Sequence, residues 1–184
     1  MELDKAIKSR RSVRNFSKKK PDWRDIIECI DSMRYSPTAG GNCVLKVILV
    51  DNEELIKKIS EACEQEFVSH AKYVVVVCSN PSRLINAYGD KNGEIYSRQQ
   101  AGAAIENFLL KIEEKGLSTC WIGYFMEDKI KNCLKIPKEI NVEAVFPIGF
   151  DAEKKKVRKE KIGLDNILYF NLYGEKRMKS PVAP

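Results

Sequence analysis

The sequence predicts a single domain that mixes α-helices with β-strands. Several segments carry apolar residues at helical spacing, while other runs are aliphatic and have the length of strands. The chain has 184 residues, enough to bury one substantial core but too few for two ordinary domains, and it contains no internal repeat. We therefore expect one domain over residues 1–184.

The expected elements follow from apolar spacing and from residues that begin or stop a helix. Pro21 and Asp22 begin a helix that lasts until the glycines of SPTAGG, and Gly116 caps the longest helix. The run KYVVVVCS is so rich in valine that we expect a central strand buried on both faces. Helices are expected at 3–7, 21–35, 52–67, 94–115 and 127–136, and strands at 45–51, 72–79, 118–123 and 142–150.

Charge gives only a weak indication of partners. The chain has 32 Lys and Arg against 26 Asp and Glu, a net charge of +6, and most charges are interspersed along predicted helix faces. Two denser basic runs, 17–20 and 154–161, suit either a phosphate group or a solvated surface. A basic nucleic-acid-binding domain ranks last among the alternatives because no base-reading motif is evident, so we expect no nucleic-acid partner.

Several classes of protein are disfavoured by what the chain lacks. No segment approaches the roughly 18 consecutive apolar residues of a membrane span, and the first residues lack the apolar stretch of a signal peptide. We therefore expect a soluble, cytoplasmic protein with no membrane partner. The six cysteines are scattered with no CxxC pair, which predicts buried, reduced thiols and no metal site. His70 is the single histidine, which disfavours a hydrolase that needs an imidazole base.

A basic cluster near the N-terminus is the first candidate binding site. Arg10, Arg11 and Arg14 provide forked donors, and Ser12 adds a hydroxyl, a combination suited to a phosphate group. The alternative is that the arginines complement the dipole of a helix end and stay in water. The chain has neither a glycine-rich dinucleotide fingerprint nor a Walker A sequence, which disfavours Rossmann-type cofactor binding and nucleotide hydrolysis.

Five segments, taken in order, resemble the nitroreductase family over nearly the whole chain. They are RRSVRNF at 10–16, YSPTAGGN at 35–42, YGDKNGEIYSRQQAGAAIENFLL at 88–110, GLSTCWIGYF at 116–125 and PIGF at 147–150. The resemblance implies an α+β fold with three α-β-α layers and a central, mainly antiparallel sheet. It also implies a homodimer in which both subunits build each FMN site.

The resemblance further implies which residues bind FMN. The N-terminal cluster would hold the phosphate, ribitol and pyrimidine side, and the loop at 37–42 would approach the isoalloxazine ring from the partner subunit. The backbone at 121–123 would face the ring near N5, and two lysines would approach the phosphate, while no catalytic side chain and no metal ligand is implied. The residues are Arg10, Arg11, Ser12, Arg14, Pro37, Thr38, Ala39, Gly40, Gly41, Asn42, Trp121, Ile122, Gly123, Lys159 and Lys161.

The loop after the second helix departs from the family pattern. Gly41, Cys43 and Leu45 stand where the family commonly has asparagine, glutamine and tryptophan. Asn42 supplies an amide one position later, and Gln100 occupies a position often held by aspartate. The contacts of this loop with the flavin are therefore the part of the resemblance that the sequence supports least.

The activity that the resemblance implies is transfer of electrons from NAD(P)H, through FMN, to a nitroaromatic, quinone or related small acceptor. The altered loop motivates an alternative, a flavin-binding or sensor protein with little turnover. The tail at 164–184 carries apolar and aromatic residues after a charged loop. It must pack either on its own domain or, as an arm, on the partner subunit of a homodimer.

Overall fold

The structure is a computed structural model that describes residues 1–153 and 161–178. It divides into two compact units, Met1–Glu153 and Lys154–Pro184, and each is described by itself. The first unit contains every strand and every α-helix of the described ranges. None of the described helices is long and apolar enough to cross a membrane.

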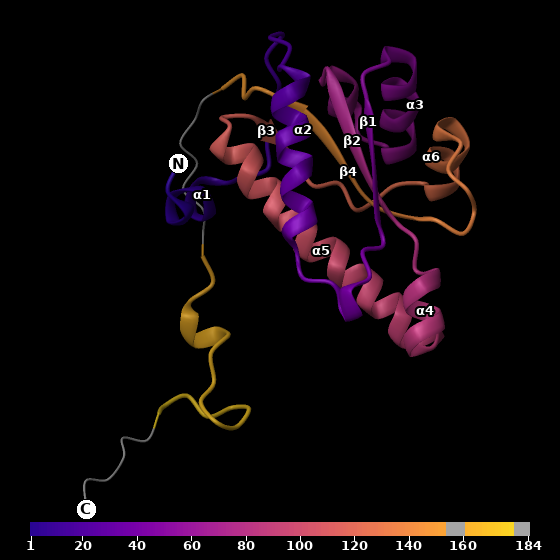
Figure 1. The fold of residues 1–184 in the computed structure, drawn as a ribbon. Helices are drawn as coiled ribbons and strands as arrows, with labels where there is room; N and C mark the ends of the chain where they lie inside the picture. The colour runs from indigo at the N-terminus through magenta and orange to yellow at the C-terminus, as the bar shows by residue number, and fades with distance from the viewer. Residues whose placement is uncertain (154–160, 179–184) are drawn as a thin grey trace, which may run out of the picture. The chain divides into compact units, whose positions relative to one another are not determined.

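A four-stranded sheet forms the centre of the first unit (Figure 1). Its strands lie in the order β1-β2-β4-β3, and each neighbouring pair is antiparallel. Every residue of β2 is buried, which confirms the central strand expected from the valine run. The strands are β1 (Leu45–Val50), β2 (Tyr73–Ser79), β3 (Ser118–Thr119) and β4 (Asn141–Gly149).

Helices cover both faces of the sheet, so the first unit has three layers (Figure 1). Helices α2 and α5 pack on one face, α3 and α6 pack on the other, and α1 and α4 contact α5. This is the α+β architecture with an antiparallel sheet that was predicted. The helices are α1 (Leu3–Ser9), α2 (Trp23–Asp31), α3 (Glu53–Cys63), α4 (Ser82–Tyr88), α5 (Asp90–Glu114) and α6 (Glu127–Leu134).

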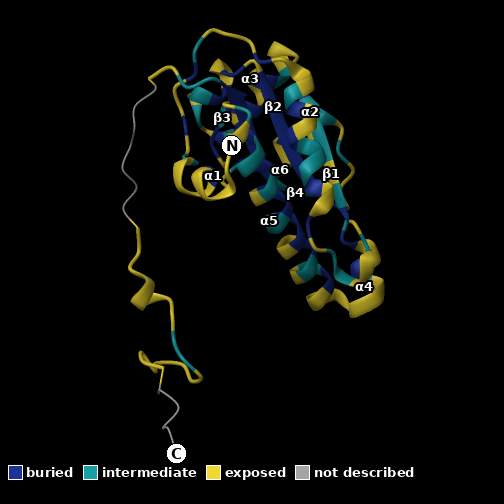
Figure 2. Cartoon of the chain, turned by 60° about the vertical axis from the view of Figure 1, so that its left-hand side comes forward, coloured by how far each residue is buried: buried dark blue, intermediate teal, exposed yellow. Residues whose placement is uncertain are grey.

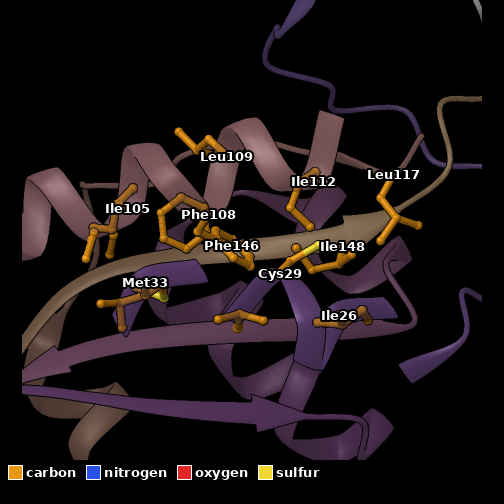
Figure 3. Packing of buried hydrophobic residues seen from close by; sticks show 14 of the residues in the cluster. Ile26, Cys29, Met33, Ile105, Phe108, Leu109, Ile112, Leu117, Phe146 and Ile148 are labelled. Carbon is orange, nitrogen blue, oxygen red and sulfur yellow. The ribbon is translucent and has the colours of Figure 1, made fainter. Parts of the chain in front are cut away.

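The core is divided between the two faces of the sheet. On the first face, side chains of β4 join those of α2 and α5, and the rings of Phe108 and Phe146 meet edge to face with centroids 5.4 Å apart (Figure 3). On the second face, Val74 and Val76 of β2 pack with side chains of α3 and α6. Neighbouring residues of β2 therefore point into opposite layers, as the period of a strand requires.

The α4–α5 region differs from the expectation. The sequence predicts a polar stretch up to Gly93, whereas the structure contains α4 there and begins α5 at Asp90. Gly89, with a φ of 78°, makes the turn between the two helices. A Cβ at Gly93 would lie 2.4 Å from the backbone nitrogen of Ile85, so the missing side chain allows the helices to approach closely. Glycines that resemble a loop signal in the sequence here serve a helix–helix contact.

Replacing Gly93 by alanine is expected to lower the free energy of unfolding by about 2 kcal/mol, because the added methyl group clashes with backbone. Gly102 lies on the same helix, and a Cβ there would meet nothing within 4 Å. Gly102→Ala should therefore be neutral or stabilising by up to about 1 kcal/mol, since alanine has the better helix propensity. Urea unfolding measures both changes, and equal stability of the two variants would contradict the close approach of α4 and α5.

Most of the described residues of the second unit are exposed (Figure 2), and they include large apolar residues. It contains one short 3-10 helix in its described part, η4 (Leu164–Asn166). Six large apolar residues of this unit are 66–93% exposed, which is an unusual concentration for a segment of this length. They are Ile162, Leu164, Ile167, Leu172, Tyr173 and Met178.

Candidate functional site

An extended N-terminal segment brings the basic cluster to the edge of the sheet at β3. The Val13 N–H donates to the Thr119 carbonyl at 2.9 Å. Val13 and Phe16 are buried, whereas Ser12 and Arg14 stay exposed. Backbone pairing and apolar side chains therefore fix the segment, while its hydroxyl and one of its guanidinium groups remain accessible.

The three predicted arginines of this segment differ in their partners. Arg11 forms a half-buried ion pair with Asp151. The Arg10 Nε lies 3.6 Å from a carboxylate oxygen of Glu106 on α5, and the Arg14 guanidinium lies 6.0 Å from the centre of a phenylalanine ring. Among the described residues, Arg14 has no acidic partner. Arg14, followed by Arg10, is therefore better placed than Arg11 to bind an anion.

A buried hydroxyl next to this segment has no partner. Thr119 is 4% exposed, and its Oγ1 accepts or donates no hydrogen bond within residues 1–153 and 161–178. It pairs with Ser12 across a parallel bridge, so the two hydroxyl-bearing residues are neighbours. An unsatisfied buried polar group costs roughly 1–3 kcal/mol, so most buried polar groups in folded proteins have a partner in the protein or in bound water. Thr119 was not among the predicted residues, although it lies inside the GLSTCWIG segment that carries the resemblance.

In the turn at 121–123, one residue is hydrogen-bonded to β4 and the other two are exposed. Ile122 is buried, and it exchanges two hydrogen bonds of 3.0 Å with Val145. Its N–H is therefore already used. The Trp121 ring is 42% exposed and meets the Phe146 ring with centroids 5.8 Å apart. Gly123 is exposed, and its N–H has no partner in the described chain, so it is an available donor, unlike the N–H of Ile122.

The ring-side loop, residues 37–42, is predicted to approach the isoalloxazine ring, and hydrogen bonds from Asn42 close it. It contains the 3-10 helix η2 (Ala39–Gly41), in which Gly40 and Gly41 have φ values of 56° and 73°. The Asn42 side-chain amide donates to the Gly40 carbonyl at 3.2 Å. The Asn42 backbone N–H donates to the Ala39 carbonyl at 3.0 Å. Asn42 thus stabilises the loop, because its amide nitrogen donates to a carbonyl of the same loop.

A cavity of about 350 Å³ lies between this loop and α5. The N-terminal cluster and the turn at 121–123 do not line it, and Arg10 meets α5 at Glu106 instead. The described residues of one chain therefore do not bring all the predicted site residues to one cavity. Lys161 is exposed in the second unit, and Lys159 lies outside the described residues. The lining residues are Pro37, Thr38, Ala39, Tyr96, Gln99, Gln100 and Ala103.

Two cysteines depart from the expectation that all are buried, since Cys43 is exposed and Cys133 is only partly buried. Burial raises the pKa of Cys29, Cys63 and Cys78 to about 12, so these thiols stay protonated near neutral pH. Cys43 is exposed, because it lies in the short link between the ring-side loop and β1. All six thiols are free.

Comparison with family models identifies one family. The model of the Nitroreductase family matches residues 7–81 and 62–150. A relative from Archaeoglobus fulgidus with the provisional name NADH dehydrogenase/NAD(P)H nitroreductase is 28% identical over 156 residues, which cover 82% of this chain and 86% of the relative.

Two solved structures show the same fold. A nitroreductase family protein from Clostridium novyi NT gives a TM-score of 0.77 at 29% identity and covers 95% of this chain and 96% of its own. The NADPH:FMN oxidoreductase of Vibrio harveyi, solved in complex with NAD⁺, gives a TM-score of 0.83 at 19% identity. That match covers 94% of this chain and 78% of the Vibrio chain. The predicted fold is therefore confirmed.

Proposed function

Since the chain belongs to the nitroreductase family, we propose that it is an FMN-dependent oxidoreductase that transfers electrons from NAD(P)H to a small organic acceptor. The observation that carries the proposal is the N-terminal segment at β3. There Ser12 and Arg14 are exposed, and Ser12 is bridged to Thr119, whose buried hydroxyl has no partner within the described residues. The family resemblance places the phosphate, ribitol and pyrimidine side of FMN at this cluster.

The residues of this segment fit a phosphate group chemically. A phosphate needs charged or polar donors that no acid already occupies. Arg14 and Ser12 meet that condition within the described residues, and the contact of Arg10 with Glu106 is long and partly exposed. Arg11 forms an ion pair with Asp151, so its predicted contact with FMN would require the guanidinium group to bind Asp151 and FMN at the same time.

When bound, FMN supplies the redox chemistry, because its ring accepts two electrons from a nicotinamide and passes them to an acceptor. The protein supplies binding and orientation. Arg14 and Ser12 anchor the anionic end, while the unpaired N–H of Gly123 offers a hydrogen bond to the polar edge of the ring. The two bonds between Ile122 and Val145 keep the Gly123 N–H in place.

We also propose that the protein is a homodimer in which the ring-side loop of one subunit completes the site of the other. Two observations support this. In one chain the loop meets α5 at Gln100, whereas the basic cluster meets it at Glu106. The second unit exposes apolar side chains that would be stabilised by burial against another surface. This favours packing of the arm at 164–184 on the partner subunit. On dilution, FMN should be released as dimers separate, and a fully loaded monomer would contradict this arrangement.

The acceptor that we propose is a nitroaromatic, a quinone or a related small molecule. We place the reaction in the cytoplasm, since a reducing compartment suits a chain whose six cysteines are all free. A flavin sensor with little turnover remains the alternative that the altered loop motivated, but the enzyme names of the relatives favour turnover.

Anaerobic reduction of the FMN-loaded protein tests the proposal. Addition of NADH or NADPH should bleach the yellow oxidised flavin, and addition of a quinone should restore the colour. Free FMN at the same concentration is the control. If neither nicotinamide bleaches the loaded protein, the reductase proposal fails. A protein that takes up no FMN would overturn the binding proposal as well.

A further inference from the structure

The side-chain amide of Gln100 joins α5 to two backbone groups at the end of the ring-side loop. Its Oε1 accepts from the Val44 N–H at 2.8 Å, and its Nε2 donates to the Asn42 carbonyl at 3.0 Å. Gln100 is only 4% exposed, and its bond with the Val44 N–H is buried, whereas its bond with the Asn42 carbonyl is partly buried. We propose that Gln100 is a positioning residue that fixes this loop for FMN binding. The proposal rests on the FMN binding proposed above.

The loop depends on its two ends for its position. At its start, the buried Ser36 is bound to the preceding turn, with its hydroxyl donating to the Met33 carbonyl at 2.9 Å. At its end, the Gln100 amide is hydrogen-bonded to Asn42 and Val44. Residues 37–41 make no hydrogen bond to another element within the described chain. Two consecutive glycines also give the loop many alternative conformations, so fixing its end removes much of that freedom.

An amide is the side chain that matches both backbone groups. It presents one acceptor to the Val44 N–H and one donor to the Asn42 carbonyl. A carboxylate could keep the first bond but would direct a second acceptor at the Asn42 carbonyl.

The lining of the cavity beside the amide carries no fixed charge. The cavity beside it is lined by backbone, small residues, a second amide and the Tyr96 phenol, with no carboxylate or amine among its lining side chains. The other titratable groups at the loop are the Cys43 thiol and the Tyr88 phenol, whose oxygen would lie 2.5 Å from a Cβ added at Gly40. A glutamate at position 100 would be buried with no Lys or Arg side chain in this cavity lining, and burial raises the pKa of a carboxyl group.

Two substitutions at this position separate hydrogen bonding from packing. Gln100→Met keeps a similar volume but removes both hydrogen bonds at every pH. Gln100→Glu keeps the acceptor and regains the donor only when the carboxyl group is protonated. Asn107→Asp is the matched control, because Asn107 also lies on α5 and its amide donates to the Ser32 backbone carbonyl, at 3.4 Å, away from the loop.

The measurement is the FMN dissociation constant from pH 5.5 to pH 8, given as the ratio of variant to unchanged protein so that titration of the FMN phosphate cancels. Gln100→Met should bind FMN about tenfold more weakly at every pH, as expected when buried backbone groups lose their partners. Gln100→Glu should match that loss at pH 8 and recover most of it as the pH falls through the raised pKa. Asn107→Asp should show a ratio near one throughout.

A second measurement does not depend on FMN. Exchange of the Val44 amide hydrogen in the FMN-free protein should be at least about tenfold faster in Gln100→Met than in the unchanged protein, since its bond is lost. If Gln100→Met retains FMN as the unchanged protein does, or if Met and Glu lose affinity equally at every pH, the positioning role is overturned. A Gln100→Glu variant that matches the unchanged protein at every pH, beside a weakened Gln100→Met, supports it, because a neutral carboxyl group keeps both bonds.

Failure of this proposal is distinguishable from failure of the proposed function. If the unchanged protein binds no FMN, the function is wrong, and no effect of Gln100 on FMN can exist. If the unchanged protein binds FMN and Val44 exchange is unaffected by Gln100→Met, only the inference about Gln100 is wrong. Circular dichroism of each variant confirms that the fold is retained.

Discussion

Replacing Arg10 and Arg14 together by glutamine is expected to weaken FMN binding about a hundredfold. A hydrogen bond to a charged group contributes roughly 1.5–3 kcal/mol, and about 1.4 kcal/mol corresponds to a tenfold change in affinity. Arg14 should account for more of the loss than Arg10, because Arg10 already lies 3.6 Å from a carboxylate oxygen of Glu106. Titration with FMN, followed by quenching of its fluorescence, gives the dissociation constants.

The control for this double variant is Lys18→Gln with Lys19→Gln, which removes the same charge from the neighbouring exposed stretch. It should change FMN affinity by less than about threefold, because screened surface charges act weakly over a distance. A loss as large as that of the arginine pair would show that net charge, and not a phosphate contact, controls binding. Thermal unfolding of both variants without FMN should be nearly the same.

Phe146→Ala is expected to lower the free energy of unfolding by about 4 kcal/mol, since removal of a buried phenylalanine leaves a cavity. Phe146 is 0% exposed and meets the Phe108 and Trp121 rings at 5.4 and 5.8 Å. The Trp121 ring would lose its partner, so FMN binding should fall as well. Denaturant unfolding measures the stability, and FMN titration of the folded fraction measures the binding.

Phe125→Ala is a suitable comparison for Phe146→Ala. Phe125 is only partly buried and packs on the cluster at the opposite face of the sheet. Its removal should cost less than half as much stability and should leave the FMN affinity of the folded protein nearly unchanged. If the two variants lose equal stability, the assignment of Phe146 to the centre of the core is wrong.

The elements that the sequence predicts well are those with a strong local cause. The valine run of β2 has little alternative to a buried strand, and Asp22 caps α2 by accepting from the Arg24 N–H, as its position before the helix suggests. The α4 helix is missed because Gly89 and Gly93 resemble loop residues until the neighbouring helix is in place. Tertiary contact, not local preference, decides that region.

The site is predicted in its residue types but not in its pairings. The arginine cluster is visible in the sequence, yet Asp151 lies 140 positions from Arg11, and only the fold places the two together. The side-chain direction of Asn42 is likewise set by the turn of the loop, which local sequence does not specify. The resemblance therefore identifies the region of the site. The hydrogen bonds and ion pairs then separate residues that are bonded within the protein from residues that are available to bind a cofactor.

The strand order has a consequence for synthesis of the protein. β4 lies between β2 and β3, so the centre of the sheet stays open until residues 141–149 have left the ribosome. The N-terminal segment then pairs with backbone that directly follows β4, because the Ser17 N–H donates to the Phe150 carbonyl at 2.8 Å. A nascent chain that ends before β4 thus carries a valine strand paired on one edge only, with β1, and a basic segment without this contact. Such long-range closure slows folding and favours assistance by chaperones that cover apolar strands.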